Sequence, residues 1–427
     1  MTISRRALLG TGAGLTLAGA LSACGSNTGR GDGSSSSGGG TGPQLAQWYH
    51  QYGEPGTEQA VRRYAAAYKK ARVTVQWRPG NYDQQTAAAL LTSGGPDVFE
   101  VNGPTLDQIR GGQVVDLTDL FEGPGVKDDF NPAVLAPKTY EGKIWSVPQV
   151  VDMQLLFYRK SLLAAANVRP PTTLDELVDA ARTLTDKKTK GLFLGNDGGA
   201  GSLGGTPLHA AGLSLVTEDG KVGFDDPAAA RALGKLRQLY ADKSLLLGAP
   251  TDWSDPSAFV QGLTAMQWSG LWALPAVQKA LGDDFGVLPF PKDGASGKPS
   301  VPVGAYGAAV SARSKQQAAA KDFIKWLWIE QADFQTDFAL SYGFHIPART
   351  SLAKKADKLK EGAAADAVKY AGENAYAQPL LWTPASQTAY QDALSRIIKD
   401  GANPDTELKT VVRRTNEELQ RVKKKSS

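Results

Sequence analysis

The chain has 427 residues, of which 41% are hydrophobic and 21% are charged, and its formal net charge at pH 7 is +4. A chain of this length is too long for one ordinary hydrophobic core, so we expect two lobes or domains. The small net charge, without a stripe of lysine and arginine interleaved with aromatic residues, argues against a nucleic-acid-binding protein. Cys24 is the only cysteine, which excludes an intramolecular disulfide bond.

Residues 1–23 are expected to form a signal peptide that is not part of the fold. Arg5-Arg6 precedes an uncharged run of mostly small residues, which is too weakly apolar for a lasting membrane span. The segment SRRALLG resembles a twin-arginine (Tat) export signal. That signal favours phenylalanine where Ala7 stands, so ordinary Sec export remains an alternative.

The residues Leu21-Ser22-Ala23-Cys24 resemble a bacterial lipobox, which implies that Cys24 is acylated, for example with palmitate. Each buried methylene of an acyl chain contributes about 0.8 kcal/mol to membrane binding, so several chains anchor a protein firmly. The residues from 24 to 43 contain almost nothing apolar after the cysteine, and we expect them to form a flexible tether. The expected location is the extracytoplasmic face of the cell membrane, through the lipid anchor.

Residues 44–150 alternate between strand and helix patterns, which is typical of an α/β protein with parallel strands and right-handed crossovers. The predicted strands are 44–50, 72–77 and 97–101, and the predicted helices are 57–71 and 82–91. In such sheets a ligand lies beyond the carboxyl ends of the strands. The residues placed near that rim are Trp48, Tyr49, Glu54, Gly80, Asn81, Tyr82 and Asn102.

The segment 144–184 contains the clearest strand and helix signals of the chain. An apolar run that ends in Leu155-Leu156-Phe157-Tyr158 predicts a buried strand, and Pro170-Pro171 stops the short helix after it. Thr173 and Glu176 then have the spacing of a capping box at the start of an amphipathic helix. Farther on, the patterns predict a strand at 191–194, helices at 203–216, 227–241, 271–281 and 318–338, and two or three helices over 352–422.

The sequence offers little catalytic chemistry. The three histidines, His50, His209 and His345, have no metal-ligand spacing, and the HExxH and GxSxG motifs are missing. A glycine-rich run at 196–201 is not followed by Lys-Ser/Thr, so it is not a P-loop. We therefore expect no metal, no cofactor and no enzyme. A glycosidase whose two acids lie far apart in the sequence remains an alternative.

Several motifs follow one another in a specific order. They are LLFYRK with PPTTLDEL (155–177), LTAMQWSGLW (263–272), FGVLPFPKDG (285–294), VGAYGAAVSARSKQQAAAKDFIKWLW (303–328) and GFHIPART (343–350). This ordered set resembles the solute-binding proteins of carbohydrate ABC importers that are related to maltose-binding protein. The resemblance implies a periplasmic-binding-protein-like α/β fold, in which a three-segment hinge joins two lobes and the ligand cleft lies between them. It implies that lobe 1 contains 44–150 and 286–345, and that lobe 2 contains 151–285 and 346–427.

The candidate ligand-binding residues combine flat aromatic rings, which pack on the apolar faces of sugar rings, with polar side chains that bind hydroxyl groups. Relatives in the resembled family carry a sugar-contacting aromatic residue in the glycine-rich strand that matches 304–307, which implies this role for Tyr306. Each of the others has a core or turn residue as its alternative interpretation. They are Trp272, Trp253, Trp382, Glu54, Asn102, Asp152 and Asp197.

The function that the resemblance implies is that of a monomeric, lipid-anchored receptor. It would close on a sugar or oligosaccharide by a population shift and deliver it to the transmembrane subunits of an ABC permease. Two alternatives stay open. One is a binding protein for a non-sugar solute such as a polyamine, a peptide or iron, and the other is a lipoprotein enzyme that acts on polysaccharide.

Overall fold

The computed structural model describes residues 42–424. The expected signal peptide, Cys24 and most of the expected tether lie outside the described residues. Between residues 42 and 424, no helix is both long enough and apolar enough to cross a lipid bilayer.

The first sheet has five strands in the order β2-β1-β3-β12-β6. Its strands β1, β2 and β3 are parallel to one another, whereas β12 is antiparallel to both β3 and β6. The parallel part confirms the predicted arrangement of residues 44–101, and its carboxyl ends form one rim. The bounds are β1 (Gln44–His50), β2 (Arg72–Arg78), β3 (Val98–Val101), β6 (Val147–Pro148) and β12 (Gly307–Val310).

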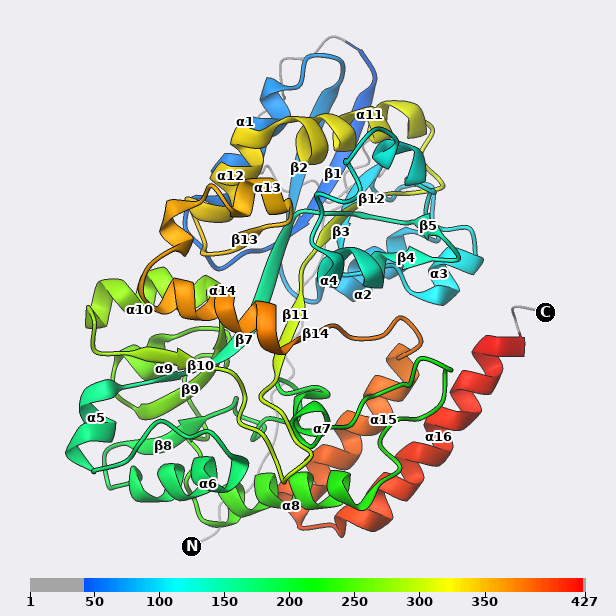
Figure 1. Ribbon diagram of the computed structural model, residues 1–427. Coiled ribbons are helices and arrows are strands. Elements are labelled where there is room, and N and C mark those ends of the chain that lie inside the picture. The colour runs from blue at the N-terminus through cyan, green and yellow to red at the C-terminus, as the bar shows by residue number, and fades with distance from the viewer. Residues whose placement is uncertain (1–41, 425–427) are drawn as a thin grey trace, which may run out of the picture. The chain divides into compact units, whose positions relative to one another are not determined.

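The second sheet is built around β7, the buried strand predicted from the apolar run. Figure 1 shows β7 running from the neighbourhood of the first sheet into the second. Its order is β14-β11-β7-β9-β8, and β10 and β13 also pair with β7. The bounds are β7 (Val150–Tyr158), β8 (Lys190–Phe193), β9 (Thr264–Gly270), β10 (Gly286–Leu288), β11 (Val301–Gly304), β13 (Ile346–Pro347) and β14 (Ala375–Tyr376). A separate hairpin joins β4 (Thr139–Tyr140) to β5 (Lys143–Ile144).

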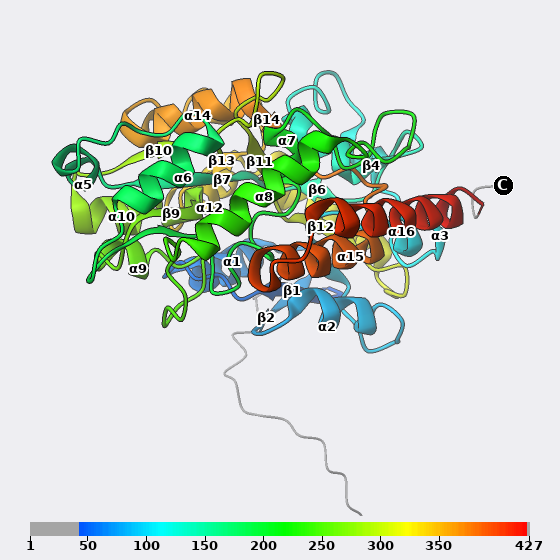
Figure 2. The ribbon, with the colours of Figure 1, turned by 90° about the horizontal axis from the view of Figure 1, so that it is seen from below.

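Helices cover both sheets, as Figures 1 and 2 show. The helices that follow or face the first sheet are α1 (Thr57–Ala67), α2 (Tyr82–Ala89), α3 (Leu106–Arg110), α4 (Pro132–Leu135), α11 (Gln317–Lys325) and α12 (Ala332–Leu340). Those associated with the second sheet are α5 (Lys160–Ala165), α6 (Leu174–Thr183), α7 (Thr206–Ala210), α8 (Pro227–Ala241), α9 (Ser257–Val260), α10 (Leu274–Leu281), α14 (Gly362–Asn374), α15 (Pro384–Ser395) and α16 (Pro404–Lys424). The short α13 (Thr350–Ala353) follows β13.

Separate hydrophobic cores lie under the two sheets, which supports the expectation of two lobes. One core packs α1, α11 and α12 against the first sheet through residues such as Tyr64, Phe323 and Trp328. Another packs α6, α8 and the last two helices against the second sheet, around the fully buried Trp268. Burial of such large side chains contributes on the order of 1.5–3 kcal/mol each, so each sheet has its own source of stability.

Local signals explain where the helices begin. The side chain of Thr173 accepts from the backbone N–H of Glu176, and the Glu176 carboxylate accepts from the backbone N–H of Thr173, so the predicted capping box of α6 is confirmed. Asp226 caps α8, and Pro227 occupies the first turn, where its missing N–H costs no hydrogen bond.

Several predicted helices are too long. The segment 203–216 is helical only over Thr206–Ala210, because glycines 204, 205 and 212 interrupt the pattern and two of them adopt positive φ. Likewise α1 ends at Ala67, since Tyr68 is already extended. The predicted helix 318–338 is three segments, in which the π-helical turn Trp326–Glu330 separates α11 from α12.

The return of the chain to the first sheet comes later than the resemblance implies. Residues 286–345 were expected in lobe 1, yet β10 and β11 within that range pair with β7 of the second sheet. The first strand beyond residue 286 to join the first sheet is β12. Strand pairing places this crossing between Gly304 and Gly307, while the remaining lobe boundaries stay a prediction.

Candidate functional site

The carboxyl end of β1 is organised by a buried carboxylate on β3. Glu100 is only 2% exposed. Its Oε2 atom lies 2.7 Å from His50 Nδ1 and accepts from the His50 backbone N–H at 3.1 Å, while Oε1 accepts from the Tyr52 hydroxyl at 2.6 Å. A carboxylate only accepts, so Nδ1 carries the hydrogen in this arrangement. The bonds fix the orientation of two rings at the rim of the first sheet.

Tyr306 adds a third ring at the same rim. It follows β11 and its ring stacks on His50, with centroids 4.2 Å apart and planes inclined by 23°. Together with Asn81, Tyr82 and Asp83 from the start of α2, these two residues line a cavity of about 290 Å³. The predicted site residue Tyr306 therefore lies at the carboxyl rim, half-buried, with its ring beside amide and carboxylate groups.

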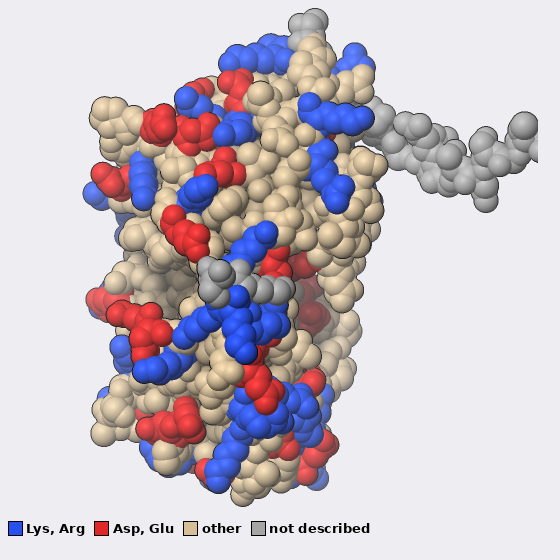
Figure 3. All heavy atoms as spheres, turned by 90° about the vertical axis from the view of Figure 1, so that its right-hand side faces the viewer, with Lys and Arg blue, Asp and Glu red and all other residues tan. Residues whose placement is uncertain are grey.

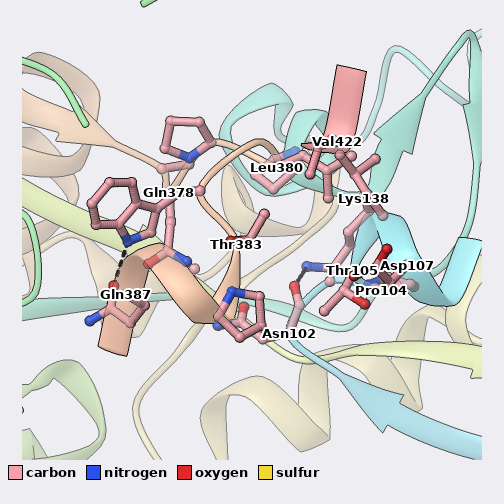
Figure 4. A pocket seen from close by; sticks show the side chains of 18 of the residues that line it. Asn102, Pro104, Thr105, Asp107, Lys138, Gln378, Leu380, Thr383, Gln387 and Val422 are labelled. Carbon is pink, nitrogen blue, oxygen red and sulfur yellow. Dashed lines mark hydrogen bonds between the residues drawn. The ribbon is translucent and has the colours of Figure 1, made fainter. Parts of the chain in front are cut away.

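A second cavity, of about 320 Å³, lies between the end of β3 and the segment that leads into α15. Figure 4 shows its side chains from close by. Asn102 and Thr105 come from the first-sheet side, and Gln378, Thr383 and Gln387 come from the other. A Cβ atom at Gly304 would lie 3.4 Å from Asn102 Oδ1, so glycine on β11 leaves room for the Asn102 amide. The cavity presents amide and hydroxyl groups from two segments far apart in the sequence.

Lys138 also lines this second cavity and is almost fully buried, at 2% exposure. Its ammonium donates to the carbonyl oxygens of Asn102 at 2.6 Å and Ala305 at 2.8 Å. Burial disfavours the charged form, and it lowers the pKa of Lys138 to about 7.

One end of the second cavity is bounded by a contact between α3 and α16. The Arg421 guanidinium lies 3.0 Å from the Asp107 carboxylate and also pairs with Glu418 on its own helix at 2.7 Å. Arg110 donates to the backbone carbonyl of Val422 at 2.5 Å. Figure 3 shows blue and red side chains intermingled on the face of the molecule where α16 lies. The contact joins the last turn of α16 to the helix that follows the first sheet.

The crossing strands carry a buried histidine between two acids. His345, 3% exposed, lies with Nε2 3.4 Å from Glu54 Oε1 and with Nδ1 3.0 Å from Asp152 Oδ2. Burial alone would lower the pKa of His345, but the two carboxylates outweigh it and raise that pKa to about 10. The imidazolium of His345 thus brings together the predicted site residues Glu54 and Asp152. The other carboxylate oxygen of Asp152, Oδ1, is buried without a hydrogen-bond partner.

Two predicted aromatic residues meet beside the carboxyl end of β9. Trp253 and Trp272 pack edge to face with centroids 5.8 Å apart, and Trp272 Nε1 donates to the Ser254 carbonyl at 2.9 Å. A Cβ atom at Gly270 would lie 1.9 Å from the Trp272 ring, so only glycine permits this packing. Both rings are half-buried, and neither of them lines one of the two cavities.

Other predicted residues have clear structural roles. Asp197 accepts from the backbone N–H groups of Gly199 at 3.0 Å and Gly201 at 2.7 Å, which shapes the glycine-rich loop. Trp382 borders the second cavity but is 3% exposed, and its Nε1 donates to Gln387 at 2.6 Å. Whether either residue contacts a ligand stays a prediction.

Sequence reasoning did not select several residues around the site. Lys138 and Arg421 gave no signal, because their roles depend on tertiary contacts. His209 stacks on Tyr376 with centroids 3.6 Å apart, and the Tyr376 hydroxyl lies 2.7 Å from Thr206 Oγ1. Burial lowers the pKa of His209 to about 4, so this ring is neutral at pH 7. His50 lies next to Tyr49 of the predicted rim and could have been found from its position at the end of β1.

Metal binding has no support in the described part of the chain. Among residues 42–424, no group of three or more histidine, cysteine, aspartate or glutamate residues could hold a metal ion. The cluster of His345, Glu54 and Asp152 is an ion-paired network, since the acids approach opposite ring nitrogens of one histidine.

The comparisons with known proteins agree with this architecture. Residues 54–328 match the family described as bacterial extracellular solute-binding protein. A diacetylchitobiose-binding protein of Streptomyces coelicolor is 27% identical over 378 residues, which are 84% of this chain and 85% of that protein. The galactooligosaccharide-binding protein of Bacillus subtilis is 24% identical over 405 residues, or 90% of each chain.

Solved structures show the same fold. The GacH receptor of Streptomyces glaucescens aligns with a TM-score of 0.74 and 26% identity, covering 89% of this chain and 99% of the receptor. A solute-binding protein of Thermotoga lettingae, solved with α-D-tagatose, aligns with a TM-score of 0.76 and 21% identity, covering 88% of this chain and 100% of that one. The periplasmic-binding-protein fold predicted from the sequence is confirmed. The matching family consists of binding proteins rather than enzymes. The chain belongs to the bacterial extracellular solute-binding proteins.

Proposed function

We propose that this protein is the substrate-binding component of an ABC importer and that its ligand is a sugar or oligosaccharide. The observation that carries the proposal is the second cavity, whose amide and hydroxyl side chains come from both the end of β3 and the start of α15. A ligand in that position would contact both halves of the molecule. Hydroxyl-rich ligands are suited to such groups, because amides and hydroxyls both donate and accept hydrogen bonds.

The stacked rings of Tyr306 and His50 supply the second feature that a sugar requires, a flat apolar surface beside polar groups. Relatives support the same class of ligand. Similar proteins include a diacetylchitobiose-binding, a galactooligosaccharide-binding and a maltodextrin-binding protein. The predicted contacts from Tyr306, Asn102 and Asp152 belong to this proposal, and so do those from Glu54, Asp197, Trp253, Trp272 and Trp382.

Closure of the two lobes would follow from a difference in ligand contacts between the open and the closed state. A ligand that touches both lobes only in the closed state stabilises that state, by as much as its affinity for the two states differs. The crossing strands β7, β11 and β13 lie together in one sheet, where β7 pairs with both of the others. Rotation of the lobes about these strands would open and close the cavity. We place lobe 1 at 44–150 and 307–345, with the remaining described residues in lobe 2.

The delivery route is also part of the proposal. Acylation of Cys24 after Tat or Sec export would anchor the protein on the extracytoplasmic side of the membrane, where the closed form would dock on permease subunits. Mass spectrometry of the mature protein from its native host tests the anchor. Acyl groups on an N-terminal Cys24 would support it, whereas an unmodified cysteine in a released protein would exclude it.

The experiment that tests the ligand class is a thermal-shift screen of the chain from Gln44 onward. The panel contains mono- and oligosaccharides, with polyamines, peptides and ferric iron as controls. A ligand at a hundredfold its dissociation constant stabilises the folded state by about 2.7 kcal/mol, which gives an easily measured shift. A response confined to the polyamine, peptide or iron arm would replace the sugar proposal with that class. Release of reducing ends from a glycan would instead indicate an enzyme.

A further inference from the structure

Lys138 is a buried cation without an acidic partner in the described part of the chain. None of the ion pairs among residues 42–424 includes it, and its two hydrogen bonds go to neutral carbonyl groups. Transferring an ammonium from water into a protein interior is costly unless an opposite charge compensates it. An ammonium group has three N–H donors, and among the described residues those of Lys138 have only these two hydrogen-bond acceptors.

The surroundings of Lys138 explain where a compensating charge could come from. The residue lines the second cavity, and Figure 4 shows its side chain ending beside Asn102, across the pocket from Gln387. Thr383, the N-cap of α15, and Pro384, its first residue, line the same cavity. The amino end of a twelve-residue helix carries partial positive charge, which favours an anion nearby.

The other charged groups near this cavity are already paired within the protein. Asp107 on α3 and Arg421 on α16 lie 3.0 Å apart. Glu100 on β3 pairs with His50, and Arg110 on α3 donates to Val422. The ammonium of Lys138 donates to two carbonyl oxygens, and burial lowers its pKa. The cavity therefore presents one positive charge that the protein leaves uncompensated.

We propose that the ligand of the second cavity is an acidic saccharide, and that its carboxylate accepts a hydrogen bond from the third donor of Lys138. This inference rests on the proposed saccharide function and narrows it to a substrate class. A uronic acid fits, because it combines a sugar ring with one carboxylate on the same small frame. Charge-assisted hydrogen bonds are roughly twice as strong as neutral ones, so the acid is favoured over its neutral counterpart.

The test compares matched pairs of ligands by isothermal titration calorimetry at pH 6. The probes are galacturonic acid with galactose, glucuronic acid with glucose, and the corresponding disaccharides, while galactose 6-sulfate represents a different anionic group. We expect the preferred uronate to bind on the order of tenfold more tightly than its neutral counterpart. We also expect this preference to decline as the pH rises above about 7, since only the protonated form of Lys138 carries the positive charge that attracts the carboxylate.

Two variants separate the role of the charge from a structural role. Lys138→Gln keeps a donor without the charge, and Lys138→Met removes both. Lys69→Met is the matched control, because Lys69 is an exposed lysine just beyond the end of α1. We expect both Lys138 variants to lose the preference for the acid and its pH dependence, while binding of the neutral sugar persists in Lys138→Gln. The control variant should behave like the wild type.

Each outcome is informative. Tight binding of neutral sugars with no gain for the acids would overturn this inference and leave the saccharide function standing. A preference for uronates that survives in Lys138→Gln would assign the recognition to another residue and overturn it as well. A preference for the sulfate ester alone would support an anionic ligand but would contradict the proposal that its anionic group is a carboxylate. Silence of every saccharide would remove the proposed function itself.

Discussion

The ring of Tyr306 lies face to face with the imidazole of His50, 4.2 Å between centroids, although the two residues are separated by most of the chain. His50 ends β1, and Tyr306 stands where the chain returns to the first sheet. The Glu100 carboxylate holds the His50 ring in place through the contact at Nδ1. This arrangement makes Tyr306 part of an oriented aromatic surface at the rim rather than an isolated side chain.

Replacing this ring tests the aromatic surface. We expect Tyr306→Ala to weaken saccharide binding by at least about tenfold, because aromatic packing contributes on the order of 0.5–1.5 kcal/mol beyond the area it buries. Tyr306→Phe keeps the ring and should retain most of the affinity. Calorimetric titration gives the dissociation constants. Equal affinity of the alanine variant and the wild type would show that the ligand does not use this ring.

The ion pair between Arg421 and Asp107 should favour the closed state modestly. Both side chains are substantially exposed, at 38% and 54%, and pairs of this kind contribute roughly 0.2–1 kcal/mol. We expect Arg421→Ala and Asp107→Ala each to weaken ligand binding by at most about fivefold, with the effect shrinking at high salt.

A double-mutant cycle isolates that contact. If the two groups act through each other, the double variant should be little weaker than either single variant. Additive effects would mean that the two residues act on the closed state independently.

His345 gives a pH dependence of stability with a definite sign. Its folded-state pKa, about 10, lies above the ordinary value of 6.5. The network with Glu54 and Asp152 therefore contributes fully below about pH 6.5, and its contribution declines as the pH rises towards 10. We expect the free energy of unfolding, measured with urea, to fall across that window by on the order of a few kcal/mol.

The matched variant is His345→Gln, which can still donate to one carboxylate but cannot be charged. It should be less stable than the wild type at pH 6, and its stability should vary less between pH 6.5 and 10. Parallel pH profiles for the two proteins would contradict the charged state assigned to His345.

Gly191 provides a test of the packing between α6 and the second sheet. A Cβ atom there would lie 1.9 Å from the carbonyl oxygen of Ala181, which is backbone and cannot move without shifting the helix. We expect Gly191→Ala to lower the free energy of unfolding by roughly 1–3 kcal/mol, as overpacking does. Gly234→Ala on α8 is the control, because a Cβ atom at that position would have nothing within 4 Å and helix propensity favours alanine. Urea denaturation of both variants checks the contrast.

Local patterns were sufficient for much of the fold. The predicted strand 44–50 and the predicted helix 227–241 have the bounds that the structure has, because strand periodicity and helix capping act within a few residues. The segment 203–216 was wrong in extent since its apolar residues are buried by tertiary packing without a helical backbone. The spacing of apolar residues alone does not distinguish a helix from a buried irregular segment.

The site was only partly accessible to sequence reasoning. Strand ends pointed to Asn102, and the family resemblance pointed to Tyr306. Lys138 could not be found, because its burial depends on carbonyl groups at residues 102 and 305, which come together only when β3 and β12 pair. The pairing of Arg421 with Asp107 likewise joins residues more than 300 positions apart.

The edge-to-face pair of Trp253 and Trp272 has an optical consequence. Indole fluorescence shifts to shorter wavelengths when water is removed from the ring, and both of these rings are half-buried beside the end of β9. Trp268 and Trp328 are buried completely and would contribute a constant background. Coverage of the pair during closure would therefore shift the emission of the unlabelled protein, and the change would be smaller in Trp272→Phe, in which only Trp253 remains. The protein would then carry its own reporter of the proposed lobe movement.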